Sequence, residues 1–242
     1  MVSEIIFLEE LLDIENLYLS KFDIKSGTVP IDNLEEIIVK VLKKIITDTT
    51  KEIHYTISGL RVILVYKTIN KLSISDLVSS RDSLNKYFEK SYLTNHLKYV
   101  NHDISYINNI GNHGLVCDVS RNDLLLPKMD GINSNIECIP SLLEWLVIFS
   151  QMAQILAYQI DYLDRDKSNT LWMKHVQAEM KGPIVNKKED WSALGEISKT
   201  RLIPMRGATW RTFSMYGEVI ESNIIFAGKI AHKLPEKLNE VK

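Results

Sequence analysis

Positively charged and aromatic side chains are interleaved in residues 197–217, a segment that contains no acidic residue. Its cations are Lys199, Arg201, Arg206 and Arg211. Its aromatic side chains are Trp210, Phe213 and Tyr216. Arginine makes paired hydrogen bonds to phosphate, and aromatic rings stack on unpaired bases. The segment is therefore typical of a groove for single-stranded nucleic acid. Three cations elsewhere in the chain are weaker candidates for the same surface: Arg61, Arg121 and Lys128.

Charge is unevenly distributed along the 242 residues, whose net charge is only -2. Residues 1–164 carry a balance of -7, and residues 165–242 carry a balance of +5. This asymmetry supports a second interpretation, in which the arginines of 197–217 pair with acidic residues of the first part. Trp210, Phe213 and Ile220 would then face the core, because they lie at helical spacing. Binding of a small anionic ligand is a third interpretation.

Other residue types that perform chemistry do not form a recognisable motif. His96, His102 and His113 lie near Asp103 and Cys117, but without the closely spaced ligand pairs of a zinc site. We therefore interpret them as scattered surface histidines and expect no metal. His175 and Glu179 are spaced as a polar pair on one helix face. No glycine-rich phosphate loop or GxSxG motif occurs, so we expect no cofactor and a non-enzymatic protein.

Helical periodicity dominates the elements that would position these residues. Apolar residues repeat at intervals of three and four, which predicts helices over 3–20 and 34–46. Further helices are expected at 75–90, 92–110, 168–181, 190–198 and 208–227. The longest apolar run predicts a central buried helix over 140–164, too short and too polar for a membrane span. Residues 56–71 fit either a buried strand or, as we favour, a buried helix.

These elements predict an all-α fold, a two-lobed helical bundle with an irregular connector. The N-terminal helical lobe would cover 1–110, and the C-terminal lobe would cover 139–242. Glycine, proline and asparagine are frequent between them, so 111–138 is expected to be the connector. Two cysteines and an acidic start without a secretory signal favour a cytoplasmic protein without a membrane partner.

The stretch from Ile107 to Gly114, followed by Leu142–Leu146, resembles HEPN-type helical domains over about 55–150. That resemblance implies a helical fold and RNA cleavage in a defence or toxin system, with Asn112 and His113 at the site. The sequence departs from the family pattern at two positions. Asn108 stands where an arginine is expected, and Val116 where a histidine is expected.

The expected two-lobed architecture with a basic segment is similar to nucleoproteins of segmented negative-strand RNA viruses. This similarity implies a non-enzymatic protein that binds single-stranded RNA and self-associates as a homo-oligomer, in host cytoplasm or virion. It is the leading hypothesis at this point. The alternatives are an HEPN-like ribonuclease or its inactive relative, and a helical protein–protein scaffold.

Overall fold

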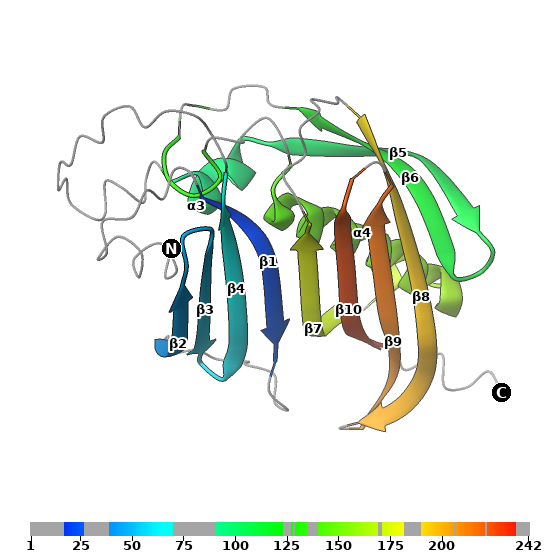
Figure 1. The fold of residues 1–242 in the computed structure, drawn as a ribbon. Helices are drawn as coiled ribbons and strands as arrows, with labels where there is room; N and C mark the ends of the chain where they lie inside the picture. Colours follow the sequence, from blue (N-terminus) through cyan, green and yellow to red (C-terminus); the bar gives the residue numbers. More distant parts are fainter. Residues whose placement is uncertain are drawn as a thin grey trace.

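The structure is a computed structural model. It describes ten separate stretches of the chain. The described residues are 17–26, 39–69, 91–122, 127, 129–134, 140–168, 171–181, 190–205, 207–220 and 222–235. They form one antiparallel sheet of ten strands and one long helix (Figure 1).

The first six strands belong to two groups at opposite edges of the sheet. They are β1 (Leu17–Lys25), β2 (Val39–Ile46), β3 (Thr50–Ile57), β4 (Leu60–Thr68), β5 (Asn101–Ile110) and β6 (Gly114–Asn122). The centre is built from β7 (Leu171–Met180), β8 (Asp190–Met205), β9 (Ala208–Val219) and β10 (Ile224–Lys233). The strand order is β2-β3-β4-β1-β7-β10-β9-β8-β6-β5, so β1 joins the N-terminal strands to the C-terminal ones.

Short helical elements accompany the sheet in the described part of the chain. Before β5 the chain makes the single turn α3 (Tyr92–Asn95) and the 3-10 turn η2 (His96–Lys98). A second 3-10 turn, η4 (Arg165–Lys167), follows the long helix.

The long helix α4 (Leu142–Asp161) lies against one face of the sheet, behind β7, β10, β9 and β8 in Figure 1. Its buried face includes Trp145, Phe149, Met152 and Leu156, which recur at the helical period. The predicted central helix over 140–164 is therefore confirmed. Tyr162 ends the helix in the left-handed conformation, with φ of 51°.

The inner face of β9 shows how tightly the sheet approaches this helix. Phe213, Met215, Gly217 and Val219 alternate along the strand and face α4. A Cβ atom at Gly217 would lie 2.5 Å from the ring of Phe149, so glycine is required there by close approach.

The predicted all-α fold is wrong, because most of the predicted helices are strands. The described part of 34–46 is β2, and 56–71 contains the end of β3, a turn and β4. The segments 168–181, 190–198 and 208–227 contribute to β7, β8, β9 and β10. Residues 17–20 of the first predicted helix lie in β1, and only the start of 92–110 is helical.

Tertiary pairing explains this error. Lys40, Lys43 and Lys44 fit the helical period, whereas strict alternation breaks at Val41 and Leu42, where the register of β2 against β3 shifts. Antiparallel pairing of β2 with β3 satisfies the backbone hydrogen bonds of both strands, and this segment is therefore a strand.

The predicted helix over 75–90 lies outside the described residues. Strand β6 falls within the predicted connector 111–138. The boundaries of the two lobes stay a prediction. The predicted helical content of the lobes is wrong, because both ranges contain strands. Among the residues described, no helix is long and apolar enough to cross a membrane.

Candidate functional site

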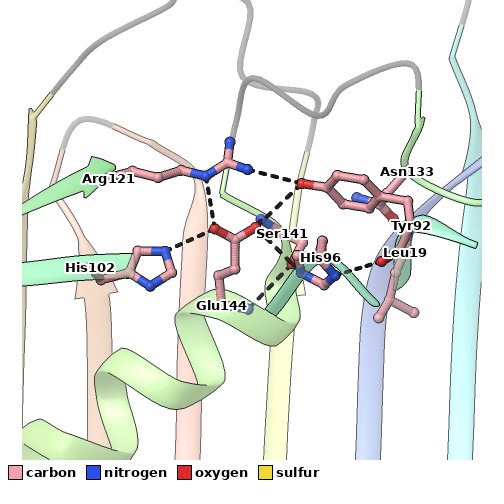
Figure 2. A network of polar contacts seen from close by, with 8 residues as sticks. All are labelled: Leu19, Tyr92, His96, His102, Arg121, Asn133, Ser141 and Glu144. Carbon is pink, nitrogen blue, oxygen red and sulfur yellow. Dashed lines mark hydrogen bonds and ion pairs between the residues drawn. The ribbon is translucent and has the colours of Figure 1, made fainter. Parts of the chain in front are cut away.

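A buried polar network surrounds the N-terminal end of α4 (Figure 2). Its side chains come from five elements between residues 92 and 144. They are Tyr92 on α3, His96 on η2, His102 on β5, Arg121 on β6, and Ser141 with Glu144 at the start of α4.

Helix capping fixes the position of Glu144. Ser141 is the N-cap residue, and its Oγ accepts a hydrogen bond of 3.3 Å from the Glu144 N–H. In return, the Ser141 N–H donates to Glu144 Oε1 at 2.8 Å. This reciprocal capping box holds the carboxylate over the first turn of α4, where the helix dipole favours negative charge.

Two neighbouring strands deliver nitrogen donors to the same carboxylate oxygen. His102 Nε2 lies 2.8 Å from Glu144 Oε2, and Arg121 Nε lies 3.0 Å from it. His102 and Arg121 are directly opposite each other in the β5–β6 ladder. The register of this pair of strands therefore places both side chains at the end of α4.

Glu144 is fully buried, yet its pKa is lowered. Burial raises the pKa, but the hydrogen bond from His102, the charge of Arg121 and the Ser141 N–H together lower it further. The side chain is therefore a carboxylate, and its Oε2 can only accept the hydrogen of His102 Nε2.

His96 lies on the other side of the carboxylate and is also fully buried. Its Nδ1 lies 2.8 Å from the carbonyl oxygen of Tyr92, so this nitrogen carries the hydrogen. Its Nε2 then accepts a hydrogen bond of 2.9 Å from Ser141 Oγ. Burial lowers the pKa of His96, which keeps the imidazole neutral as this pattern requires. Its ring stacks on Tyr92 with centroids 4.4 Å apart.

Tyr92 links the arginine to the second carboxylate oxygen. Arg121 Nη2 donates to the Tyr92 hydroxyl at 3.2 Å, and that hydroxyl lies 3.5 Å from Glu144 Oε1. The Arg121 guanidinium is therefore held in one orientation by two partners.

His102 is the most accessible member of the pairs formed with Glu144, with 9% of its side chain exposed against 3% for Arg121. Its Nδ1 has no hydrogen-bond partner among the residues that the structure describes. The network thus joins a fully buried anion to an imidazole with one uncommitted nitrogen near the surface.

Sequence reasoning dismissed two of these residues and missed others. His96 and His102 were interpreted as scattered surface histidines, which is wrong, because His96 is fully buried against Ser141 and His102 is half-buried against Glu144. Within the described ranges no cluster suited to a metal ion occurs. The Ser141-x-x-Glu144 capping box was a visible signal for the position of the carboxylate.

The described residues among those predicted to bind nucleic acid lie on β4, β6, β8 and β9. Arg121 belongs to the buried network, whereas Arg61, Lys199 and Arg201 are exposed on β4 and β8. Lys128 and Arg206 lie outside the described residues. Lys199 has a φ of 54°, at a register shift between β8 and β9.

The remaining members of the basic segment have partners within the protein. Arg211 Nε donates a hydrogen bond of 3.1 Å to Asp161 Oδ1. Asp161 is one of the acidic residues of 1–164, so this contact is of the kind expected in the second interpretation of the basic segment. Phe213 is buried against α4, and Trp210 Nε1 donates to the Met205 carbonyl at 3.2 Å. Tyr216 is exposed and donates to Glu218.

Two smaller predictions concern residues in the β5–β6 turn and on β7. Asn112 and His113 are exposed in the turn between β5 and β6, where no helix is present. His175 and Glu179 lie on β7 instead of one helix face, and each contacts β1. His175 Nε2 is 3.0 Å from Asp23 Oδ1, and Glu179 is 3.4 Å from Lys21 Nζ.

The described residues thus form one antiparallel sheet packed against a long helix, with a buried polar network at the N-terminal end of that helix. The family model described as Pseudomonas avirulence D protein (AvrD) matches residues 84–235, which is more than half of the chain. The chain belongs to this AvrD family. No curated protein matches it.

Several solved structures are similar to the chain at low identity. The tesB protein of Mycobacterium avium subspecies paratuberculosis has a TM-score of 0.47 and 8% identity, covering 97% of this chain and 86% of its own. A hot dog fold protein of unknown function from Alicyclobacillus acidocaldarius has a TM-score of 0.43 and 6% identity, with coverages of 90% and 80%. The dehydratase domain from the CurJ module of curacin polyketide synthase has a TM-score of 0.35 and 8% identity, with coverages of 99% and 83%.

The family match and the β-sheet fold overturn the two resemblances inferred from the sequence. The chain is neither an HEPN-type domain nor a viral nucleoprotein. The nucleoprotein-like RNA-binding function, the HEPN-like ribonuclease and the helical scaffold are corrected with these resemblances. Self-association stays a prediction.

Proposed function

We propose that the protein is an enzyme that performs acid–base chemistry on a small organic substrate at the network around Glu144. The observation that carries this proposal is the His102–Glu144 pair. A buried carboxylate holds one imidazole nitrogen at 2.8 Å, and the other nitrogen is uncommitted among the described residues. This arrangement orients a histidine for proton transfer.

Each side chain has a separate role in this proposal. His102 Nδ1 takes a proton from a C–H or O–H bond of the substrate. The resulting imidazolium is stabilised through Nε2 by the Glu144 carboxylate. The same Nδ1–H then returns the proton to another atom of the substrate, which restores the neutral imidazole. Arg121 and Ser141 position the carboxylate and touch no reacting atom.

The cost of the network supports a functional role. Burial of a carboxylate with an arginine stabilises a fold poorly compared with apolar residues of the same volume. Clusters of buried ionisable groups with shifted pKa values are concentrated at active sites. Glu144 and His96 both have shifted pKa values, and they share contacts with Ser141.

Untargeted mass spectrometry of extracts from a bacterial host tests this proposal without a known substrate. The host expresses wild type, His102→Gln or Glu144→Gln, and the protein level and fold of each are verified. We expect compounds that accumulate with wild type and fall to the level of the empty host with both variants. The product mass then separates isomerisation, loss of water and hydrolysis.

His54→Gln is the matched control. His54 also contacts a carboxylate, that of Glu52, but this pair lies partly exposed on β3, away from α4. The extract of the host that expresses His54→Gln should contain the same accumulated compounds as the wild-type extract, at the same levels. Product levels that are unchanged in folded His102→Gln, or reduced equally in His54→Gln, would contradict the assignment.

A further inference from the structure

A second polar cluster lies at the opposite end of α4. The helix rises 1.5 Å per residue, so Asp161 lies about 25 Å along the axis from Glu144. Around this end the chain places Ser168 after η4, Arg211 on β9 and His232 on β10. None of these residues takes part in the network around Glu144.

The central contact of this cluster joins a hydroxyl to a buried imidazole. Ser168 Oγ lies 2.8 Å from His232 Nε2. His232 is fully buried, whereas Ser168 is only partly buried. Ser168 is therefore the more exposed residue of the pair.

The other nitrogen of His232 is unusual. Nδ1 is buried and has no hydrogen-bond partner in the described part of the chain. Buried polar atoms without partners are rare in folded proteins, and each needs an explanation. When Nε2 accepts the hydrogen of Ser168, Nδ1 carries the hydrogen of the neutral imidazole.

An ion pair lies beside His232. Arg211 is directly opposite His232 in the β9–β10 ladder, and it bonds to Asp161 through Nε and Nη2. Burial lowers the pKa of His232, the Asp161 charge raises it, and Arg211 lowers it. The net direction is downward, so the imidazole is neutral and able to accept a proton.

We propose that Ser168 and His232 form a nucleophile–base pair for acyl transfer from esters or thioesters. His232 Nε2 takes the Ser168 proton while Oγ forms a bond to the carbonyl carbon. The bond to the leaving alcohol or thiol breaks, and the leaving group takes that proton from Nε2. Water then releases the acid from Ser168 by the reverse exchange of protons. Asp161 stabilises the imidazolium that forms between these steps.

An alkyl fluorophosphonate is the probe for this pair. Ser168 Oγ would form a bond to phosphorus, fluoride would leave, and His232 would take the hydroxyl proton. We expect one adduct on the folded wild-type protein, located on Ser168 by peptide mapping. Ser168→Ala should remove it, and His232→Gln should slow its formation on the order of 10²- to 10⁴-fold.

Ser222→Ala is the control, because Ser222 is also half-buried and its hydroxyl donates to the Val219 carbonyl at 3.5 Å instead of contacting an imidazole. Its labelling should equal that of wild type. If His232→Gln does not fold, the pH dependence of wild-type labelling decides. A rate that falls in acid as one imidazole is protonated supports the pair. A rate proportional to hydroxide throughout, no adduct on Ser168, or an undiminished rate in folded His232→Gln would overturn it.

Discussion

His102 and Arg121 lie directly opposite each other on β5 and β6, and both contact Oε2 of Glu144. One cross-strand pair thus holds a buried carboxylate from one side, while the capping box of α4 holds it from the other. The sheet register and the helix start are therefore coupled through one side chain. Changes at Glu144 should affect stability and chemistry together.

Glu144→Gln should destabilise the protein by about 3–5 kcal/mol near neutral pH, because it leaves the buried Arg121 charge without its counter-ion. The free energy of unfolding in urea measures this effect. Glu52→Gln removes the partner of His54 on the partly exposed part of β3 and should cost less than about 1 kcal/mol. Equal losses in the two variants would contradict the central position of Glu144.

The stability of the protein should fall as the pH is lowered from neutrality. The pKa of His96 is lowered in the folded state, so the unfolded chain binds more protons below the ordinary value of 6.5. The stability that neutral His96 contributes is present above pH 6.5, and it is lost as the pH falls toward the pKa of His96 in the folded protein. His232 acts in the same direction, because its pKa is also lowered.

A second loss should begin lower on the pH scale. The pKa of Glu144 is lowered by its partners despite burial, so its contribution is present above the ordinary value of 4.5 and is lost below it. Urea unfolding across this range measures both losses. As the pH falls from neutrality toward the folded pKa of His96, the His96→Asn variant should lose less stability than wild type. Stability that rises on acidification would exclude the neutral state assigned to His96.

Gly217→Ala should destabilise the fold by about 1–3 kcal/mol, because its Cβ would lie 2.5 Å from the Phe149 ring. Gly195→Ala is the comparison. There the nearest atom is Met152 Cε at 3.0 Å, the far end of a flexible side chain. The melting temperature of Gly217→Ala should therefore fall more than that of Gly195→Ala. The opposite order would contradict the packing of α4 on β9.

The long helix was predictable from sequence, whereas the sheet was not. Helix α4 combines an apolar face with a capping box, and both signals lie within one continuous segment. In β9 the inward row Phe213, Met215, Gly217 and Val219 alternates, but glycine interrupts its apolar pattern. The spacing of Trp210 and Phe213 then suggested a helix. The ring of Phe149, which explains Gly217, lies 68 residues earlier in the chain.

The candidate site depends on contacts that periodicity does not reveal. His102 meets Glu144 across 42 residues, and His96 meets Ser141 across 45. These contacts follow from the β5–β6 register and from the docking of α4 on the sheet. Arg121 was selected for its charge, but its neighbours give it a different role from phosphate binding.

The orientation of His102 can be measured directly in the ¹⁵N-labelled protein. Long-range proton–nitrogen correlation spectra in mildly alkaline buffer report which ring nitrogen carries the hydrogen, and His102→Gln assigns the signal. We predict that Nε2 of His102 is protonated and Nδ1 is not, and that Glu144→Gln produces a mixture of both tautomers. A wild-type imidazole that carries its hydrogen on Nδ1, or that exchanges freely between the two tautomers, would contradict the proposal that Glu144 prepares His102 for proton transfer.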